Sequence, residues 1–500
     1  MFNDIRSFYK NKNILLTGGT GFLGKLIIEK LLRTCDVEGV YLIVKSKKGL
    51  TPEERIQNLI DEPVMAKVRE KDPEKLKKIH VIDGNLTKKD LGLSVENKEI
   101  ILNKVNIVFH CGASLNMDLK LQESVITNVR GTMEIVNIVN QSKHIHSFIL
   151  VSTAYSNCYE HVIEEKFYEP PINPELLIRM CEEIDPDMLS NISLGLIGKW
   201  QNSYVFTKSV AENIVFLHGR KIPAGVFRPA IVTSTVAEPL PGWSDNLYGP
   251  LGILLASHCG ILRVIKANGN LRNHTVPGDM CINAILCFAW DLFNKWKTSK
   301  ENYTPSVLNF SAKDTKLYIT SKEFVDCKNI DYLPFKKTMW YQMLFLVKSK
   351  YNYFLLKFLV HSIPAYLIDM VLKISSRKTR MKSIYAKIEK TSDILSYFLL
   401  HEWDIHNENM KLLWQKMNSD DKETFNFDVN SIEVNVYLKN VLIGLKKYIL
   451  KEDMTKSKLH KQRYERLTVV HKTIKYSFYG LVSILMYRSL TRFVLKKNRV

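Results

Sequence analysis

A glycine-rich turn near the start of the chain constrains the fold more than any other feature. The apolar run Ile14–Leu16 predicts a strand, and the pattern of Lys25–Leu32 predicts a helix. Between them, Gly18, Gly21 and Gly24 fall on a G-x-x-G-x-x-G spacing. Glycine permits a tight turn and lets a pyrophosphate approach the backbone, and the N–H groups at a helix start attract phosphates. The turn therefore predicts a dinucleotide site. The expected contact residues are Thr17, Gly18, Thr20, Gly21, Phe22 and Gly24.

Strand-like and helix-like segments alternate over the first part of the chain. This alternation predicts a parallel sheet with helices on both faces, so we expect an α/β fold with a Rossmann-type doubly wound sheet. Helical patterns include 125–139 and 204–217. A Pro/Gly-rich stretch, 238–252, predicts a long loop that carries substrate contacts. The candidate strands are Ile14–Leu16, Val40–Val44, Ile79–Ile82, Ile107–Phe109, Ser147–Val151 and Ala224–Phe227.

The net charge of +20 on 500 residues calls for an acidic partner. The sequence has no helix-turn-helix, zinc-finger or aromatic RNA motif, so a nucleic-acid partner is not expected. Much of the excess charge lies in the C-terminal tail, which favours an acidic membrane surface. The eight cysteines form no C-x-x-C pair, so we expect free thiols in a reducing compartment and no metal site. The first residues lack an apolar signal-peptide core, which predicts synthesis in the cytosol.

Two short motifs predict reductase chemistry. Tyr204 and Lys208 form a Y-x-x-x-K pair, which shares one face of a helix. An ammonium group near the phenol would lower the tyrosine pKa from its usual value of about 10 and make Tyr204 a proton donor. Ser152 and Thr153 follow the candidate strand 147–151, at the sheet edge where ligands bind. Together these four side chains suit a carbonyl that receives hydride from a nicotinamide cofactor; the alternative is that the two hydroxyls only cap the strand.

The residues after the second strand indicate which cofactor is used. An acidic residue about 20 positions beyond the glycines would bind the ribose hydroxyls of NAD. Here the strand ends in Lys45-Ser46-Lys47-Lys48, with no acid. Three lysines suit a 2′-phosphate, so we predict NADPH; the alternative is an ordinary solvated basic turn.

With these motifs the chain resembles the alcohol-forming fatty acyl-CoA reductases, in the extended short-chain dehydrogenase/reductase superfamily. The resemblance covers most of residues 11–300 and about 361–453. The stretches that carry it are TGGTGFLGK at 17–25, NVRGT at 128–132, VSTAYSN at 151–157, YVFTK at 204–208, RPAIVTSTVAEPLPGWSDNLYGP at 228–250 and HSIPAYLIDMVL at 361–372.

The resemblance implies that NADPH reduces a long-chain fatty acyl-CoA through an aldehyde to a primary fatty alcohol, as in lipid, wax or ether-lipid precursor metabolism. It implies that Thr153, with Ser152 beside it, stabilises the oxyanion. Tyr204 would give the proton and Lys208 would hold the nicotinamide ribose. Lys45 stands where the family has arginine, and Asn85 where it has aspartate. The cofactor contacts implied by the matched motifs are Lys45, Asn85, Asn128, Tyr204, Lys208, Arg228 and Pro229.

Four regions are expected along the chain. Residues 1–325 form an NADP-binding Rossmann reductase domain with substrate-loop insertions, and 326–360 form an amphipathic connecting segment. Residues 361–453 form a mostly helical C-terminal domain of the fatty acyl-CoA reductase type, and 454–500 form a basic and apolar tail. The apolar part of that tail is shorter than the ~20 residues of a membrane span, so we expect an interfacial helix. The alternative is a terminal helix packed on the protein.

Two alternatives to this function remain from sequence. One is a related extended short-chain reductase that acts on another carbonyl substrate, and the other is a non-catalytic NADP-binding membrane protein. Association with the endoplasmic reticulum membrane is the expectation, with the peroxisome as the other organelle the resemblance suggests. Residue types leave open the acyl chain length, whether reduction stops at the aldehyde, the number of membrane spans and the oligomeric state.

Overall fold

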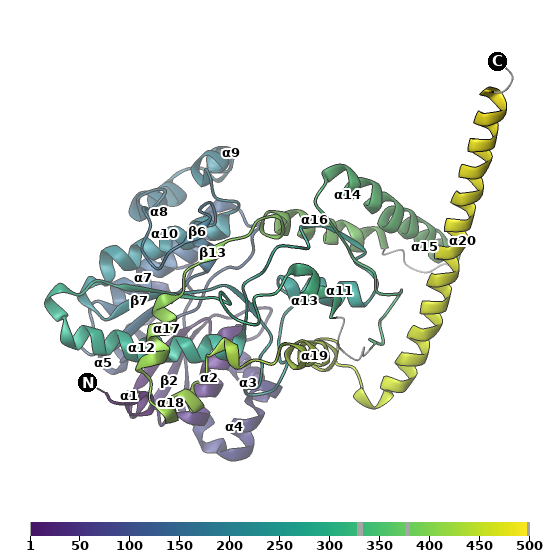
Figure 1. Cartoon of the computed structure of the whole chain (residues 1–500). Coiled ribbons are helices and arrows are strands. Elements are labelled where there is room, and N and C mark those ends of the chain that lie inside the picture. The colour runs from purple at the N-terminus through teal and green to yellow at the C-terminus, as the bar shows by residue number, and fades with distance from the viewer. Residues whose placement is uncertain (1, 328–333, 376–380, 498–500) are drawn as a thin grey trace.

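One parallel sheet forms the centre of the protein (Figure 1). The computed structural model describes residues 2–327, 334–375 and 381–497. Seven strands lie in the order β11-β7-β5-β4-β1-β2-β3, and every neighbouring pair is parallel. The order reverses at β1, which confirms the doubly wound Rossmann-type sheet expected from the sequence. The strands are β1 (Asn13–Thr17), β2 (Gly39–Val44), β3 (Ile79–Asp83), β4 (Ile107–His110), β5 (Ser147–Val151), β7 (Ala224–Pro229) and β11 (Ser306–Phe310).

Helices cover both faces of this sheet, so alternate strand residues enter two separate cores. On β1, Ile14 and Leu16 belong to the core that includes α2 and α12, whereas Leu15 belongs to the core that includes α7 and α10. Strands buried on both faces read as continuous apolar runs, which made six of them recognisable. The helices of this part are α1 (Ile5–Tyr9), α2 (Phe22–Thr34), α3 (Pro52–Asp61), α4 (Ala66–Lys71), α5 (Val95–Lys104), α6 (Leu121–Val125), α7 (Gly131–Val139), α8 (Pro174–Glu183), α9 (Pro186–Ile197), α10 (Ser203–His218) and α12 (Gly278–Thr298).

The strand β11 was not expected from the sequence. Its apolar run is interrupted by Asn309, whose side chain is fully buried. The Asn309 amide donates to the carbonyl oxygens of Ile163 (3.2 Å) and His406 (2.9 Å), which lie far away along the chain. A buried amide of this kind is satisfied only by tertiary contacts, and sequence patterns do not report those.

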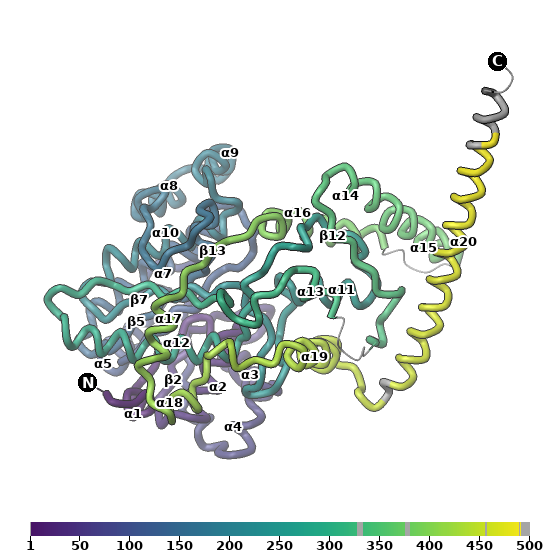
Figure 2. The backbone as a smooth tube through the Cα atoms, viewed as in Figure 1, coloured from purple at the N-terminus to yellow at the C-terminus, as the bar shows by residue number. Residues whose placement is uncertain are grey.

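After α16 the chain returns across the reductase domain. Figure 2 shows it running through β13, α17 and α18 in front of the sheet. The strand β13 (Asp404–Ile405) pairs with β6 (Val162–Ile163), and α17 packs against β11 and α12. The backbones of Gly242 and Gly444 also touch, since a Cβ at Gly444 would lie 1.7 Å from the carbonyl oxygen of Gly242. The C-terminal helices are therefore part of one packed unit with the sheet.

The remaining elements lie mostly in the second half of the chain. Two small parallel pairs join β8 (Ile231–Thr233) with β10 (Thr275–Pro277) and β9 (Val264–Lys266) with β12 (Phe345–Val347). The other helices are α11 (Pro250–His258), α13 (Ser321–Asp326), α14 (Lys350–Lys357), α15 (Ile363–Ile374), α16 (Met381–Leu400), α17 (Glu408–Lys416), α18 (Ser419–Thr424), α19 (Val434–Gly444) and α20 (Ser457–Lys497).

The tail forms the single long helix α20, which projects from the body of the protein (Figure 1). The basic and the apolar stretches expected from sequence lie in this one continuous helix. Among the described residues, one helical run has the length and composition of a membrane span, and it is Lys350–Ile374 rather than α20. That run comprises α14, the π-helical segment Phe358–Ser362 and α15. It gives weak support for membrane association.

Candidate active site

The glycine turn joins β1 to α2 at the carboxyl edge of the sheet. Gly18 has φ +73°, and a Cβ there would lie 2.8 Å from the backbone nitrogen of Gly112. A Cβ at Gly24 would lie 2.3 Å from the carbonyl oxygen of Gly18. Gly21 caps the start of α2 without a side-chain hydrogen bond, so no capping side chain occupies the helix N-terminus. The turn thus fits a dinucleotide pyrophosphate, because side chains are absent where the phosphates would approach.

Thr17 ends β1 directly before this turn, and its hydroxyl bonds to the protein. Its Oγ1 lies 2.6 Å from Nδ1 of His110 and accepts the backbone N–H of Gly112 at 3.0 Å. Burial lowers the pKa of His110 to about 3, so the ring is neutral. Thr132 Oγ1 lies 3.0 Å from the other ring nitrogen and donates to the carbonyl of Asn128. Thr17 is fully buried, so its expected cofactor contact is corrected to a structural role.

His110 is a positioning residue that sequence reasoning missed. It ends β4 and bridges β1 to α7 through two threonine hydroxyls. The signal available was a histidine at the carboxyl end of an apolar strand, followed directly by Cys111-Gly112. The neutral imidazole thus connects the end of β1, directly before the glycine turn, to α7.

A second missed residue is Arg55 on α3. Its Nη1 donates to the backbone carbonyl of Lys45 at 2.6 Å, and its Nη2 donates to Thr20 Oγ1 at 2.7 Å. Lys45 itself is exposed directly after β2. Arg55 therefore connects the two segments that sequence assigned to the cofactor and adds a cation at the carboxyl end of β2. The signal was an arginine one helical turn after the capping residue Thr51, in the helix that follows the lysine turn.

Phe22 is held by the long loop after β8. Its ring stacks on Trp243, with centroids 5.3 Å apart and planes at 16°. Trp243 is buried in the core that includes α2 and α12. The stretch 238–252 thus packs over the start of α2, which brings the expected substrate loop next to the glycine turn.

Tyr204 and Lys208 lie one turn apart at the start of α10, and Lys208 ties this helix to the end of β5. Its Nζ donates to the carbonyl oxygen of Val151 at 2.8 Å. Burial lowers the pKa of Lys208 to about 8 and raises the pKa of Tyr204 above its usual value. The sequence predicted a lowered pKa for Tyr204. That prediction is wrong for this structure, because desolvation governs the phenol and the ammonium group is directed at the Val151 carbonyl.

Ser152 and Thr153 follow β5, but the structure gives them different surroundings. Ser152 is buried and its hydroxyl donates to the carboxylate of Glu212. The Thr153 hydroxyl accepts the backbone N–H of Tyr155 at 3.2 Å and so caps the short helix Ala154–Asn157. Thr153 keeps its O–H for donation, whereas Ser152 is committed to Glu212. The predicted contact of Ser152 with substrate is therefore corrected to a supporting role.

Arg228 is a structural residue rather than a cofactor contact. It is fully buried and pairs with Glu212 through two nitrogens, at 3.0 and 2.6 Å. Its remaining donors reach the carbonyls of Glu164 and Lys166. Because these bonds occupy the guanidinium inside the core, it does not extend to the crevice. Pro229, which ends β7 and is buried, remains a predicted cofactor contact.

The two asparagines expected at the cofactor form local bonds. Asn128 lies in the π-helical segment Ile126–Arg130 and is buried. Its amide holds both backbone groups of Ser114 and donates to Thr207 Oγ1 at 3.0 Å, so it positions the loop after β4 against α10. Asn85 follows β3 and accepts the N–H and hydroxyl of Thr87. Asn128 is therefore a positioning residue, and Asn85 remains a predicted contact at the edge of the crevice.

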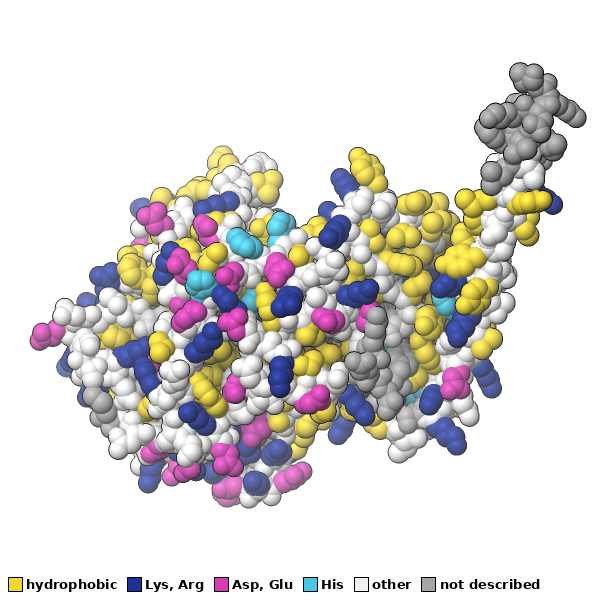
Figure 3. Space-filling model, in the orientation of Figure 1, with side chains coloured by type: hydrophobic (Ala, Val, Ile, Leu, Met, Phe, Trp, Pro, Cys, Tyr) yellow, Lys and Arg dark blue, Asp and Glu magenta, His cyan; other side chains and the backbone are white. Residues whose placement is uncertain are grey.

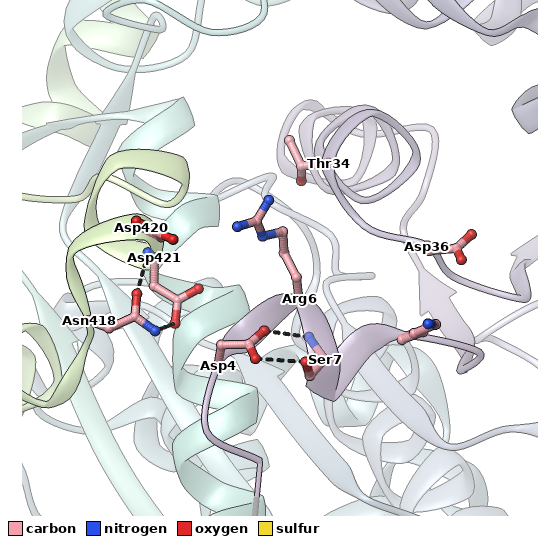
Figure 4. A pocket seen from close by; sticks show the side chains of 9 residues that line it. Asp4, Arg6, Ser7, Thr34, Asp36, Asn418, Asp420 and Asp421 are labelled. Atoms are coloured by element: carbon pink, nitrogen blue, oxygen red, sulfur yellow. Dashed lines mark hydrogen bonds between the residues drawn. The ribbon is translucent and has the colours of Figure 1, made fainter.

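A polar pocket at the opposite edge of the sheet is not this site. Figure 4 shows Asp4, Arg6, Thr34 and Asp421 around it, from segments that precede β1 and β2 and from α18. Asp4 accepts two hydrogen bonds from Ser7 as the cap of α1. The pocket thus lies at the amino ends of the strands, away from the glycine turn and α10.

Known proteins with similar sequences match this chain over nearly its whole length. A family model described as male sterility protein matches residues 16–285, and a second model with the same description matches residues 360–452. The fatty acyl-CoA reductase wat of Drosophila melanogaster is 36% identical over 98% of this chain and 94% of its own. The chain belongs to the fatty acyl-CoA reductase family.

Another member, fatty acyl-CoA reductase 1 of Homo sapiens, is 34% identical over 97% of this chain and 93% of its own length. Among solved structures, the reductase domain of a nonribosomal peptide synthetase from Mycobacterium tuberculosis has a TM-score of 0.58 at 14% identity. The match covers 87% of this chain and 91% of that chain. The terminal reductase domain of the myxalamid pathway has a TM-score of 0.53 at 16% identity, covering 87% and 90%. These two structures share the fold of this chain.

Gly18→Ala is expected to abolish nicotinamide cofactor binding, because the new Cβ would meet the backbone of Gly112 at 2.8 Å. Gly49→Ala is the matched control, since Gly49 has φ +79° but nothing within 4 Å of its Cβ position. Both substitutions strain the backbone, and only the first lacks space. Calorimetric titration with NADPH and NADH measures the binding. Equal losses in the two variants would show that backbone strain, not space at the turn, governs the effect.

Glu212→Gln is expected to lower the free energy of unfolding by about 3–5 kcal/mol, because it leaves the buried Arg228 charge without its partner. Replacing both partners, by Glu212→Leu with Arg228→Met, is expected to restore most of the loss. Urea unfolding followed by circular dichroism gives the free energy of unfolding of the unsubstituted protein, the Glu212→Gln variant and the double variant. If an Arg228→Met variant kept its stability but bound NADPH more weakly, Arg228 would be a cofactor contact instead.

Proposed function

We propose that this protein reduces long-chain fatty acyl-CoA to a primary fatty alcohol with NADPH. The observation that carries the proposal is the buried Lys208 on the Val151 carbonyl, which holds Tyr204 and Thr153 at the sheet edge that bears the glycine turn. The named activity of the two relatives that match nearly the whole chain supports the substrate class. A non-catalytic member of the fold has no need of a buried lysine beside an intact tyrosine.

Tyr204 and Thr153 would act on the carbonyl oxygen of the substrate. The bound nicotinamide cofactor supplies hydride. The Thr153 O–H donates to the oxygen as negative charge develops there, which stabilises the transition state. A raised pKa keeps the Tyr204 phenol protonated at neutral pH, so it holds a proton for the alkoxide, a stronger base. Lys208 would lie beside the nicotinamide ribose and bind it through the ammonium protons that are not donated to the Val151 carbonyl.

Two rounds of this step account for the alcohol. In the first, hydride adds to the thioester carbon and gives a hemithioacetal, whose C–S bond breaks to release CoA thiol and an aldehyde. In the second, hydride adds to the aldehyde carbon and Tyr204 protonates the oxygen. Each round consumes one NADPH and one proton, so the overall reaction takes two of each.

The choice of NADPH over NADH rests on the cations at the end of β2. Lys45, Lys47 and Lys48 are all exposed there, and no acidic residue occupies the position that would bind ribose hydroxyls. Arg55 adds a planar guanidinium that is oriented by Thr20 and the Lys45 carbonyl. Arginine binds phosphate oxygens in a fixed geometry, so Arg55 compensates for lysine at position 45.

The tail helix α20 would place the enzyme on a membrane, for which we propose the endoplasmic reticulum. Its basic half suits acidic headgroups, and its exposed apolar half, which includes Ile484 and Leu485, suits the acyl boundary. A long-chain acyl-CoA partitions to the same surface.

Tyr204→Phe is expected to abolish aldehyde and alcohol formation while NADPH still binds, because only the transferable proton is lost. The control is Tyr303→Phe, which removes the hydroxyl of a different buried tyrosine; that hydroxyl donates to the carbonyl oxygen of Ala224 at 2.7 Å, at the amino end of β7. Mass analysis of products from NADPH and a panel of acyl-CoAs measures the effect. If the Tyr204→Phe variant formed product at the rate of the control, Tyr204 would not be the proton donor.

Lys45→Glu and Arg55→Leu are each expected to weaken NADPH binding while leaving NADH binding nearly unchanged. Only the 2′-phosphate distinguishes the two cofactors, and it would lie against these cations. Lys10→Glu repeats the charge change at the opposite edge of the sheet and serves as the control. Titration of both cofactors gives the ratio of dissociation constants. A ratio that stays constant across the variants would show that the basic turn is only solvated.

A further inference from the structure

The helical run from α14 through α15 carries an apolar face that none of the described residues covers. Figure 3 shows hydrophobic side chains gathered over these two helices, on the side from which α20 projects. The residues we call the α14–α15 face are between 47 and 59% exposed: Leu355, Phe358, Leu359, Leu367, Met370 and Val371. Within each half of the run these residues are one, three or four positions apart, which places them on one side of a helix. The step from Leu359 to Leu367 is longer and passes through the π-helical segment.

The opposite side of the same run is packed on the protein. Tyr353, His361, Ala365 and Asp369 are buried, and the last three recur at four-residue intervals from the π-helical segment into α15. His361 accepts the backbone N–H of Arg263 at 3.0 Å and its ring stacks on Tyr385 of α16 at 4.6 Å. The run is therefore amphipathic, with one face held by α16 and β9.

Polar anchors show that this run does not leave the protein to cross a bilayer. The Asp369 carboxylate accepts the backbone N–H groups of Met381 (3.0 Å) and Lys382 (3.1 Å) at the start of α16. Lys357 forms an ion pair with Glu389 of α16. Moving the run into hydrocarbon would break these contacts and bury their charges, which is costly. An interfacial position keeps them on the protein side.

The charges around the face favour an anionic surface. Lys348, Lys350 and Lys373 are exposed at the two ends of the run, and the Lys382 ammonium lies 3.5 Å from the ring centre of Tyr366. Asp369 is the one acidic residue within 350–374, and it is buried. An apolar stripe with basic ends and no exposed acid matches the interface between headgroups and acyl chains of anionic lipids.

We propose that the α14–α15 face is a second membrane-docking surface, which lies in the plane of an anionic bilayer and acts in addition to α20. The base of α20 packs on the segment just before α14, where Trp340 donates to His471 at 3.2 Å. Two contacts in fixed relation would orient the reductase domain, whereas the single helix α20 would only tether it. The proposal does not depend on the reduction chemistry, so it is tested by binding and not by activity.

The test uses the full-length protein with an environment-sensitive fluorophore on a single introduced cysteine. Leu359→Cys reports the face, and Leu412→Cys on α17, where the leucine is 53% exposed, is the matched control. Seven of the eight native cysteines are buried, and Cys111 is half-buried. The unsubstituted protein, treated with the same fluorophore, gives the background signal from native cysteines, which is subtracted. With phosphatidylcholine–phosphatidylserine vesicles, the 359 label is expected to shift to the blue and the 412 label is not. Lipids brominated near the headgroup are expected to quench the fluorescence of the 359 label more than lipids brominated at the chain end.

Three results would overturn the proposal. If the fluorophore at Leu359→Cys does not shift with vesicles while one at Tyr479→Cys on α20 does, α20 docks alone. Stronger quenching by deep bromine would mean that the run spans the bilayer. A shift that follows protein concentration without vesicles would mean that a second copy covers the face. As a second variant, Lys350→Glu with Lys373→Glu is expected to weaken vesicle binding about fivefold or more per lysine, with the loss suppressed by salt.

Discussion

The hydrogen bond from Lys208 to the carbonyl of Val151 is the contact on which the rest of the site depends. It ties α10 to the end of β5, where Thr153 follows two residues later. It also keeps an ammonium group in the core, where burial lowers its pKa to about 8. A helix fixed to a strand end in this way holds Tyr204 close to the residues that follow β5, and the proposed transfer of hydride and proton depends on such fixed positions.

Around this contact, two groups of buried polar residues connect the strands and helices of the site to one another. Thr17, His110 and Thr132 connect β1, β4 and α7, while Ser152, Glu212 and Arg228 connect β5, α10 and β7. Both groups are buried. The two ring nitrogens of His110 and the carboxylate oxygens of Glu212 all take part in hydrogen bonds, so each group favours one arrangement of the strands. The C-terminal helices extend this framework, since β13 and α17 pack back onto the reductase sheet.

Several predicted site residues bond to the protein in this structure, so their contacts with cofactor or substrate stay predictions. Ser152, Asn128 and Arg228 all lie near the carboxyl edge, as expected, yet their side chains bond to the protein. A motif gives the residue type beside a site, but it does not give the direction of the side chain. Arg55 and His110 were missed for the converse reason, because they reach the crevice from a helix and a strand end that carry no recognisable motif. The pKa of Tyr204 also depends on burial, which spacing does not report.

The sequence by itself determined the layered fold, the glycine turn, the Tyr204–Lys208 pair and the family, because local periodicity and short motifs encode them. Six of the seven strands followed from apolar runs, since strands buried on both faces need no polar alternation. Only the tertiary structure decided which polar side chains face the crevice, that Asn309 completes a strand, and that α14–α15 is packed on one side and bare on the other. Those outcomes depend on contacts between residues far apart along the chain, and burial and desolvation arise only when such contacts form.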